Sequence, residues 1–287
     1  MRVQQLLKNA AVVLTGAGVE ESCLEAELLL QGCLNVSRSR LFLLFDQQVD
    51  PVQEQRFHEF LFRRCRREPL QYILGSCEFW SLDFYVTPAV LIPRPETEFL
   101  LEHMFSTLAL ERDIPELKVL DLCTGSGVIA VVLARELVHA AVTAADYSPD
   151  ALALARKNIA RHGLAERINL VCADLLNSFR SEQVFDVIVT NPPYVIAGDL
   201  PGLEPEVRDW EPELALSGGK SGMDVIERIC RSAVHHLKSG GWLFMEIGAD
   251  LEEPVEYIFT SSGRYEQVGI VQDWAGRPRV LQAKFVE

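Results

Sequence analysis

The sequence lacks a long uncharged hydrophobic run and is poor in basic residues. No stretch of about 18 apolar residues occurs, so no membrane span is expected. The first eight residues also lack the continuous apolar segment of a signal peptide. The 287 residues carry 41 Asp and Glu against 27 Lys and Arg, a formal net charge of -14. Because such a surface repels phosphate backbones and anionic lipids, we expect neither membrane association nor direct nucleic-acid binding as the main activity.

Paired cysteines and metal-ligand spacings are also missing. The seven cysteines are an odd number, none belongs to a C-x-x-C pair, and most have apolar neighbours. This pattern indicates reduced thiols, not disulfides or a zinc site. We therefore expect a cytoplasmic protein without a metal.

The charge is unevenly distributed, which indicates two parts of different character. Residues 1–75 hold nine basic and nine acidic side chains, so all of the net charge lies in residues 76–287. The first part contains short apolar-periodic stretches and no convincing strand, which predicts a small helical domain. One helix is expected at 51–67, because Asp50 can cap it and Pro51 suits its first position. Four arginines near its end suit the helix dipole better than nucleic-acid binding: Arg63, Arg64, Arg66 and Arg67.

The rest of the chain has the pattern of a hairpin followed by alternating strands and helices. Residues 78–86 are rich in aromatic and β-branched residues around a polar Ser-Leu-Asp centre, which predicts a β-hairpin. Further strands are expected at 119–123, 141–146, 168–172, 185–190 and 242–247, and helices at 127–137, 150–162 and about 223–237. This alternation predicts a mainly parallel sheet covered by helices on both faces. Two last strands, at 265–271 and 279–285, suit an antiparallel edge.

A glycine-rich turn, Asp121-Leu-Cys-Thr-Gly125-Ser-Gly127, follows the first of these strands and opens a helix. Glycine at 125 and 127 lets the backbone turn sharply and lets a ligand approach closely. Asp146 ends the next strand, nineteen residues beyond Gly127, where its carboxylate can accept hydrogen bonds from both hydroxyls of a ribose. The arrangement predicts a site for a nucleotide-like cofactor.

Two cofactors match this turn. The spacing Gly125-x-Gly127-x-x-Ala130 fits the loose dinucleotide fingerprint of nicotinamide enzymes. Asp121 favours S-adenosylmethionine over a dinucleotide. Its carboxylate would lie close to the negatively charged pyrophosphate of a dinucleotide, whereas it suits the positive ammonium of a methionine moiety. Asp174, after the third strand, could accept a hydrogen bond from an adenine amino group; a helix N-cap or a solvated carboxylate explains it equally well.

The most specific motif is Asn191-Pro192-Pro193-Tyr194, directly after the strand expected at 185–190. The prolines end the strand and fix the backbone, so the Asn191 side chain and the Pro192 carbonyl can point together into the crevice beyond it. Both groups accept hydrogen bonds and can hold the two N–H groups of a planar NH2, while Tyr194 packs against the flat group that bears it.

Such a grip suits methyl transfer to an amide or arylamine nitrogen, whose delocalised lone pair is a weak nucleophile. Two acceptors can draw the nitrogen toward a tetrahedral geometry and aim its lone pair at a sulfonium methyl. An ordinary turn is the alternative interpretation of N-P-P-Y. Its place in a sheet that also carries a cofactor-type turn weighs against that alternative.

With these motifs the chain resembles the protein-(glutamine-N5) methyltransferases that modify peptide-chain release factors, the HemK/PrmC family. The resemblance covers nearly the whole length and includes residues 68–75, 91–98, 211–216, 218–219, 246–248 and 273–279. Residues 92–98 are the most specific of these, because generic methyltransferases lack them. The resemblance implies S-adenosylmethionine as cofactor and no metal. The substrate it implies is the glutamine of the Gly-Gly-Gln motif of class 1 release factors.

The implied fold is α/β. A class I methyltransferase domain at 93–287, Rossmann-like with a mainly parallel sheet and an antiparallel edge, would follow two smaller parts. These are an all-α substrate-recognition domain at 1–75 and a β-hairpin linker at 76–92.

The resemblance also implies roles for particular residues. Asp146 would bind the ribose, Asp174 with Leu175 would border the adenine, and Arg94 and Glu246 would be secondary cofactor-pocket residues or members of a structural ion pair. The cofactor loop would be Cys123, Thr124, Gly125, Ser126 and Gly127. The glutamine amide would be held by Asn191, Pro192, Pro193 and Tyr194, of which Asn191, Pro192 and Tyr194 would serve catalysis and Asn191 would also border the cofactor.

Two positions depart from the family pattern. Cys123 stands where relatives commonly have Gly, which predicts a slightly altered loop that still binds the cofactor. Leu175 stands where relatives often have an aromatic residue, which predicts weaker packing against the adenine.

Three rival functions remain open at this stage. A DNA adenine-N6 or cytosine-N4 methyltransferase could hold the exocyclic amine of a flipped base with the same N-P-P-Y turn. The net charge of -14 and the lack of a basic target-recognition segment weigh against it. A nicotinamide-dependent oxidoreductase would need a proton donor and a hydride-acceptor pocket, and none can be located. The intact loop and N-P-P-Y turn make a non-catalytic binding module the weakest alternative.

Overall fold

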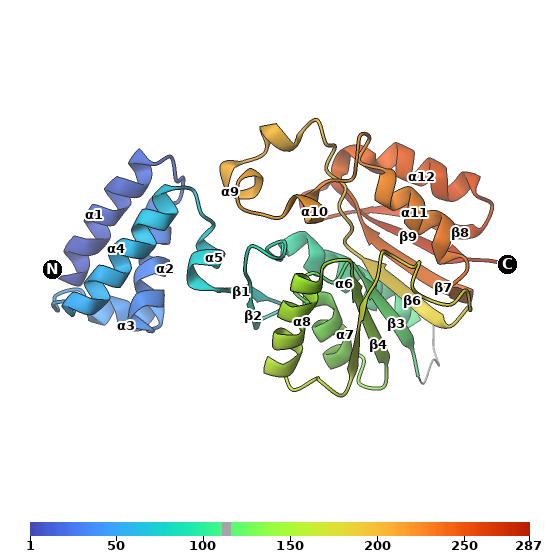
Figure 1. Ribbon diagram of the computed structural model, residues 1–287, viewed down its shortest axis with the longest axis horizontal. Helices are drawn as coiled ribbons and strands as arrows, with labels where there is room; N and C mark the ends of the chain where they lie inside the picture. The colour runs from blue at the N-terminus through green and yellow to red at the C-terminus, as the bar shows by residue number, and fades with distance from the viewer. Residues whose placement is uncertain (111–115) are drawn as a thin grey trace. The chain divides into compact units, whose positions relative to one another are not determined.

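The computed structural model describes residues 1–110 and 116–287, which form two compact units (Figure 1). The first unit comprises Met1–Ser76 and Glu204–Trp210, and the second comprises Cys77–Leu203 and Glu211–Glu287. Three chain connections therefore join the units, because seven residues far along the sequence belong to the first one.

The first unit is helical. Its helices are α1 (Val3–Gly16), α2 (Ser22–Leu34), α3 (Arg38–Leu43), α4 (Pro51–Cys65), α5 (Leu70–Leu74) and the single turn α9 (Pro205–Arg208). The helix expected at 51–67 is α4, and its start is confirmed: the Asp50 side chain accepts a hydrogen bond from the Val52 N–H at 2.9 Å. Phe57 and Leu61 of α4 are buried and Phe60 is half-buried, so its apolar face packs on the core of this unit.

The four arginines at the end of α4 all have partners within the first unit. Arg63 pairs with Glu68, and the Arg66 guanidinium lies over the Phe62 ring. Arg64 pairs with both Glu25 and Glu206. Arg67 also pairs with Glu206, with its Nη2 2.6 Å from Glu206 Oε2. The helix dipole is therefore only one of the interactions of these four arginines, because each also contacts a carboxylate or an aromatic ring.

The expected hairpin is present as β1 (Ser76–Phe79) and β2 (Leu82–Tyr85). Its turn differs from the expectation, which centred on Ser-Leu-Asp at 81–83. The turn consists of Trp80 and Ser81, both with φ of 55°, and Leu82 and Asp83 already belong to β2. Two left-handed residues match the twist of a two-residue hairpin, but these positions favour Gly or Asn, so a turn at Trp80 and Ser81 is hard to predict.

The second unit contains a seven-stranded sheet. Its strands are β3 (Lys118–Leu122), β4 (Ala141–Asp146), β5 (Ile168–Cys172), β6 (Phe185–Thr190), β7 (Leu237–Glu246), β8 (Tyr265–Gln272) and β9 (Pro278–Phe285). Their order is β5-β4-β3-β6-β7-β9-β8. The first five in this order are parallel, and β9 pairs antiparallel with both β7 and β8. The expected parallel sheet with an antiparallel edge is confirmed.

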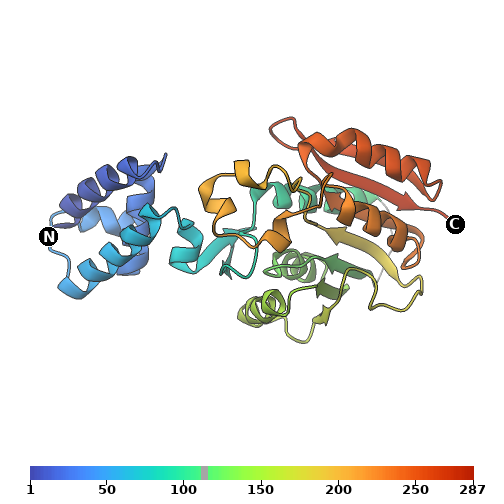
Figure 2. The same ribbon diagram turned by 45° about the horizontal axis from the view of Figure 1, so that its top comes forward.

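Helices cover both faces of this sheet, as expected (Figure 2). The helices of the second unit are α6 (Pro95–Leu110), α7 (Val128–Glu136), α8 (Pro149–Arg161), α10 (Glu213–Leu216), α11 (Asp224–Ala233) and α12 (Glu252–Ser261), with single 3-10 turns η1 (Leu200–Gly202) and η2 (Ala249–Leu251). Alternate strand residues face opposite sides. Leu120 and Ile188 pack with α11 and α12, whereas Val119 and Val187 pack with α6, α7 and α8.

The connections run in opposite directions from the middle of the sheet. From β3 the chain continues through α7 to β4 on one side, and β6 lies on the other side. Ligands of open α/β sheets bind at this kind of switch point, beyond the carboxyl ends of the strands. The turn at 123–127 and the N-P-P-Y turn follow β3 and β6 there, and are therefore neighbours.

Candidate functional site

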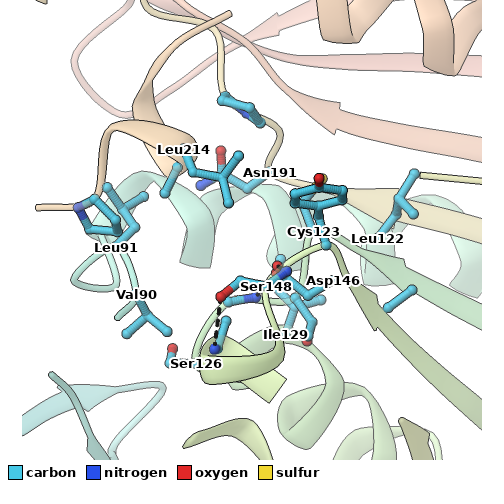
Figure 3. Close-up of a pocket in the computed structure, with 18 of the residues that line it drawn as sticks. Val90, Leu91, Leu122, Cys123, Ser126, Ile129, Asp146, Ser148, Asn191 and Leu214 are labelled. Atoms are coloured by element: carbon cyan, nitrogen blue, oxygen red, sulfur yellow. Dashed lines mark hydrogen bonds between the residues drawn. The ribbon is translucent and has the colours of Figure 1, made fainter. Parts of the chain in front are cut away.

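A cavity of about 470 Å³ lies within the second unit at the carboxyl ends of β3, β4 and β6 (Figure 3). Its volume is in the range of small-molecule sites. Ten residues that the sequence predicted line it: Arg94, Cys123, Thr124, Gly125, Ser126, Asp146, Asp174, Leu175, Asn191 and Pro193. Gly127, Pro192 and Tyr194 are not among its lining residues in the described part of the chain.

The cofactor-type loop is shaped by left-handed residues. Cys123 has a φ of 62° and Gly125 a φ of 55°. A Cβ added at Gly125 would meet no atom within 4 Å, so this glycine leaves open space for a ligand. Gly127 instead faces α8, where an added Cβ would lie 3.1 Å from the Ala155 Cβ. Glycine at 127 therefore lets the start of α7 pack against α8.

Asp146 joins the end of β4 to the loop. Its Oδ2 accepts a hydrogen bond from the Gly125 N–H at 2.8 Å, and its Oδ1 accepts one from the Ser148 N–H at 2.9 Å. Burial raises the pKa of Asp146, and the hydrogen bonds from Ser148 and Gly125 oppose that rise. Each carboxylate oxygen accepts more than one hydrogen bond, so both can still receive a hydroxyl of a bound diol.

Asp121 has a different place from the one expected. It is fully buried, and its Oδ2 accepts hydrogen bonds from the Thr124 hydroxyl at 2.5 Å and from the Ala130 N–H at 3.0 Å. Burial raises its pKa to about 7. Asp121 is not among the residues that line the cavity, and its Oδ1 has no hydrogen-bond partner within the described residues. The expectation that Asp121 meets a methionine ammonium therefore stays a prediction.

Asp174 and Leu175 border the cavity beyond β5. Asp174 Oδ2 accepts hydrogen bonds from Arg228 at 2.7 Å and from Asn177 at 3.2 Å, and the bond from Arg228 lowers the pKa of this carboxyl group. Leu175 is buried and has a φ of 51°. Asp174 is thus a half-exposed carboxylate at the cavity that is paired with Arg228, an ion pair that was not expected. Its contact with an adenine stays a prediction.

Arg94 and Glu246 do not contact each other but have separate partners. Arg94 Nη2 lies 2.7 Å from Glu211 Oε1, in an ion pair whose carboxylate is buried. Burial raises the pKa of Glu211 and the Arg94 charge opposes it. Glu246 instead accepts hydrogen bonds from Thr97 and Tyr194. Arg94 is therefore ion-paired and also lines the cavity, whereas Glu246 does not line it within the described residues.

The N-P-P-Y turn is fixed from several sides. Asn191 lines the cavity, and its Nδ2 donates a hydrogen bond to Thr97 Oγ1 at 3.1 Å. The Tyr194 hydroxyl donates to Glu246 Oε1 at 3.2 Å, and burial raises the pKa of this phenol. Three glycines approach the tyrosine closely: a Cβ at Gly218 would lie 2.7 Å from its Cα, one at Gly222 would lie 2.6 Å from its carbonyl oxygen, and one at Gly248 would lie 3.2 Å from its ring.

Several lining residues were not anticipated, among them Val90, Leu91, Thr97, Ser148, Leu214 and Arg228. Figure 3 shows Asn191 and Leu214 across the cavity from Asp146 and Ser148. Ser148 had a readable signal, because it stands before Pro149 and its hydroxyl caps α8 by accepting from the Ala151 N–H. Thr97 lies in the segment 92–98 that supports the family resemblance, but that segment assigned it no role of its own.

Two kinds of feature are absent from residues 1–110 and 116–287. No cluster of three or more His, Cys, Asp or Glu side chains there could hold a metal ion. No helix in these ranges is long and apolar enough to cross a membrane.

The seven-stranded sheet and its flanking helices have the fold of class I α/β methyltransferases. The chain superposes with a TM-score of 0.54 on a methyltransferase of Pyrococcus furiosus, at 19% identity over 78% of this chain and 98% of that one. It superposes with a TM-score of 0.52 on the Thermus thermophilus 16S rRNA N2 G1207 methyltransferase RsmC in complex with AdoMet and guanosine. That match has 22% identity over 73% of this chain and 49% of RsmC.

Sequence relatives define the family more narrowly. Residues 5–75 match the PrmC N-terminal domain, and residues 95–200 match the methyltransferase small domain. The release factor glutamine methyltransferase of Koribacter versatilis is 41% identical over 98% of both chains. That of Geobacter sulfurreducens is 44% identical over 91% of this chain and 89% of its own. The chain belongs to the family of release factor glutamine methyltransferases.

Proposed function

We propose that this protein transfers a methyl group from S-adenosylmethionine to the side-chain amide nitrogen of the glutamine in the Gly-Gly-Gln motif of class 1 peptide-chain release factors. The family membership supports the substrate. The observation that carries the chemistry is that Asn191 and the cofactor-type loop line one cavity. A substrate amide and a methyl donor held there would meet in a single cavity.

The cavity fits the proposed cofactor. The open space at Gly125 admits a ligand against the backbone, and Asp146 keeps lone pairs for the two ribose hydroxyls. We assign the adenine end to Asp174 and Leu175, and the other loop contacts to Cys123, Thr124 and Ser126. When bound, the cofactor supplies an electrophilic sulfonium methyl group.

Asn191 and Pro192 would hold the substrate amide by accepting its two N–H bonds. This grip localises the lone pair on nitrogen and orients it. The amide proton that is displaced when the nitrogen takes up the methyl group leaves to water. Tyr194 does not fit a proton-transfer role, because its hydroxyl binds Glu246 and its pKa is raised by burial. We assign to Tyr194 and Pro193 the task of fixing the turn and bordering the amide.

The helical unit would recognise the protein substrate. Residues 5–75 match the PrmC N-terminal domain and residues 95–200 the methyltransferase domain, so a division at 1–75, 76–92 and 93–287 remains our proposal. Release factors act in translation, which places the reaction in the cytoplasm. We expect no metal and no direct nucleic-acid substrate.

A methyl-transfer assay tests the assignment. Purified protein is incubated with tritiated S-adenosylmethionine and either a class 1 release factor, the same factor with the motif glutamine changed to alanine, or duplex DNA. Label in the unaltered factor alone is expected. Label in DNA and none in protein would support the DNA methyltransferase instead. Calorimetry that detects NAD binding and no S-adenosylmethionine binding would support an oxidoreductase.

A further inference from the structure

A chain of hydrogen bonds leads from a buried carboxyl group to the Asn191 amide. The Thr97 hydroxyl donates to Glu246 Oε2 at 2.7 Å and accepts from Asn191 Nδ2 at 3.1 Å. Thr97 lies in the first turn of α6 and Glu246 is the last residue of β7. Both are buried, with relative exposures of 3% and 1%. The family-like segments at 91–98 and 246–248 thus meet at the N-P-P-Y turn.

The direction of these bonds determines which end of the amide is free. A hydroxyl group has one proton to donate. Because Thr97 gives that proton to Glu246, it can only accept from Asn191, and the NH2 end of the amide must face it. The carbonyl oxygen of Asn191 is then the end left for another donor.

The Thr97 hydroxyl can donate to Glu246 whether the carboxyl group of Glu246 is ionised or protonated. Burial raises its pKa, while hydrogen bonds from Thr97 and Tyr194 and the nearby Arg279 charge oppose the rise. A proton bound on Oε1 can be shared with the Tyr194 hydroxyl, since that hydroxyl can also accept. In that state Oε2 still accepts from Thr97.

Burying a carboxyl group among hydroxyl partners costs stability, and an apolar side chain of similar volume would pack there without this cost. The Arg279 guanidinium donates to Asp273 and to the Ile247 carbonyl, so its strongest contacts lie elsewhere. A role in orienting Asn191 accounts for a polar group at this position.

We infer that Thr97, held by Glu246, is a positioning residue that fixes the Asn191 side chain with its oxygen toward the substrate amide. The inference rests on the proposed function. If the amide were rotated by half a turn, its NH2 would face the substrate NH2. Two donors would then oppose each other, and the nitrogen lone pair would lose its orientation.

Thr97→Val tests the inference, because valine keeps the branched shape and removes the hydroxyl. We expect kcat for release-factor methylation to fall roughly tenfold, the effect of losing one hydrogen bond in the transition state. The Kd for S-adenosylmethionine should change less than about threefold, and Thr97→Ser should restore most of the activity. Thr107→Val is the matched control on α6, because its hydroxyl binds only the His103 carbonyl of the same helix.

A double-mutant cycle separates positioning from general stability. In an Asn191→Ala background Thr97→Val should change kcat less than about twofold, because the group that it orients is gone. The same tenfold loss in both backgrounds, or no loss in either, would overturn the inference.

A readout without turnover keeps the inference independent of the proposed function. The side-chain NH2 protons of Asn191, observed by nuclear magnetic resonance, should exchange with water faster in Thr97→Val than in wild type or Thr97→Ser. Equal exchange would refute the hydrogen-bond chain. A wild-type protein that does not methylate release factors would refute the proposed function alone.

Discussion

Asn191 and Asp146 line the same cavity but belong to different parts of the proposed reaction. Asn191→Ala removes one acceptor for the substrate amide, so kcat should fall roughly 10²-fold or more, as for loss of one preorganised hydrogen bond. Its affinity for S-adenosylmethionine should change little. Asp146→Ala should do the reverse and weaken cofactor binding first. Initial rates and isothermal titration calorimetry measure the two effects.

Asp150→Ala is the control for this pair, because Asp150 is an exposed carboxylate in the first turn of α8 and lies outside the cavity lining. It should leave both quantities unchanged. Wild-type turnover in Asn191→Ala, or wild-type cofactor affinity in Asp146→Ala, would show that the roles are misassigned.

Asp121 gives a pH dependence of stability. Burial raises the pKa of this carboxyl group from 3.8 to about 7, so the folded protein binds the proton more tightly than the unfolded chain. The stabilisation is therefore present at low pH and is lost as pH rises from 3.8 through about 7. Asp121→Asn has no such proton to lose.

Urea unfolding of wild type and Asp121→Asn across this window measures the effect. The free energy of unfolding of wild type, relative to that of the variant, should decrease by up to about 1.4 kcal/mol per pH unit as pH rises. A difference that does not vary with pH would contradict the assignment.

The backbone conformations of Cys123 and Leu175 and the role of Thr97 could not be predicted from the sequence. Cys123 and Leu175, the two departures from the family pattern, both have left-handed backbones with φ of 62° and 51°. A glycine adopts such a backbone more easily, so the backbone at Cys123 is one that suits glycine. The role of Thr97 could not be predicted, because it depends on Glu246, 149 residues away.

Among the elements, the N-P-P-Y turn depends on glycines that bring the next loop close to it. A Cβ at Gly218 would lie 2.6 Å from the Gly222 carbonyl oxygen and 2.7 Å from the Tyr194 Cα. Gly218→Ala should therefore displace the turn, lower stability by about 1–3 kcal/mol as overpacking does, and reduce kcat. Thermal unfolding and initial rates check both.

Gly198→Ala is the matched control in the same loop, because a Cβ there would meet no atom within 4 Å. It should behave like wild type. If both alanine variants are equally stable and active, the close packing of Gly218 on Tyr194 does not matter to the site.

The sheet was predictable to a large degree, since β4, β5 and β6 begin and end at the expected residues. Helices α6 and α12 were not predicted. The beginning of β7 was also not predicted. The strand begins at Leu237, where the sequence predicted the end of a helix, and not at 242 as expected. Gly240 has a φ of 78°, and the register with β6 shifts between Phe185 and Val187. Such an irregularity depends on the neighbouring strand, which local sequence does not reveal.

For the whole molecule, the most specific finding is that seven residues from the later sequence belong to the helical unit. Glu206 attaches this segment to the unit through ion pairs with Arg64 and Arg67. Burial raises the pKa of Glu206, but the hydrogen bonds from the two arginines lower it further, so the net direction is downward. Glu206→Ala should weaken the attachment by about 2 kcal/mol, less than for a fully buried pair because the Arg67 side chain is 25% exposed.

Hydrogen exchange read by mass spectrometry measures this attachment. Amides at 204–210 should exchange roughly 30-fold faster in Glu206→Ala, the factor that corresponds to about 2 kcal/mol. Asp209→Ala is the control, because its carboxylate pairs with the adjacent Arg208 at the surface. Equal exchange in all three proteins would mean that the ion pairs do not hold the segment.

The net charge of -14 also acts at this scale. It weighs against a DNA substrate, and the arginine cluster of α4 does not offset it, since Glu25, Glu68 and Glu206 occupy three of the four guanidinium groups. The two parts expected from the charge distribution correspond broadly to the two units. That residues 204–210 belong to the first unit could not be predicted, because their place there depends on ion pairs between residues far apart in the sequence.

In the proposed reaction the methylated atom is the side-chain amide nitrogen of a release-factor glutamine. Fragmentation mass spectrometry of the Gly-Gly-Gln peptide, after incubation of the release factor with this protein and S-adenosylmethionine, locates the methyl group. We expect the mass of one added methyl group on the glutamine side chain. An unmodified glutamine, or a methyl group on any other residue, would contradict it.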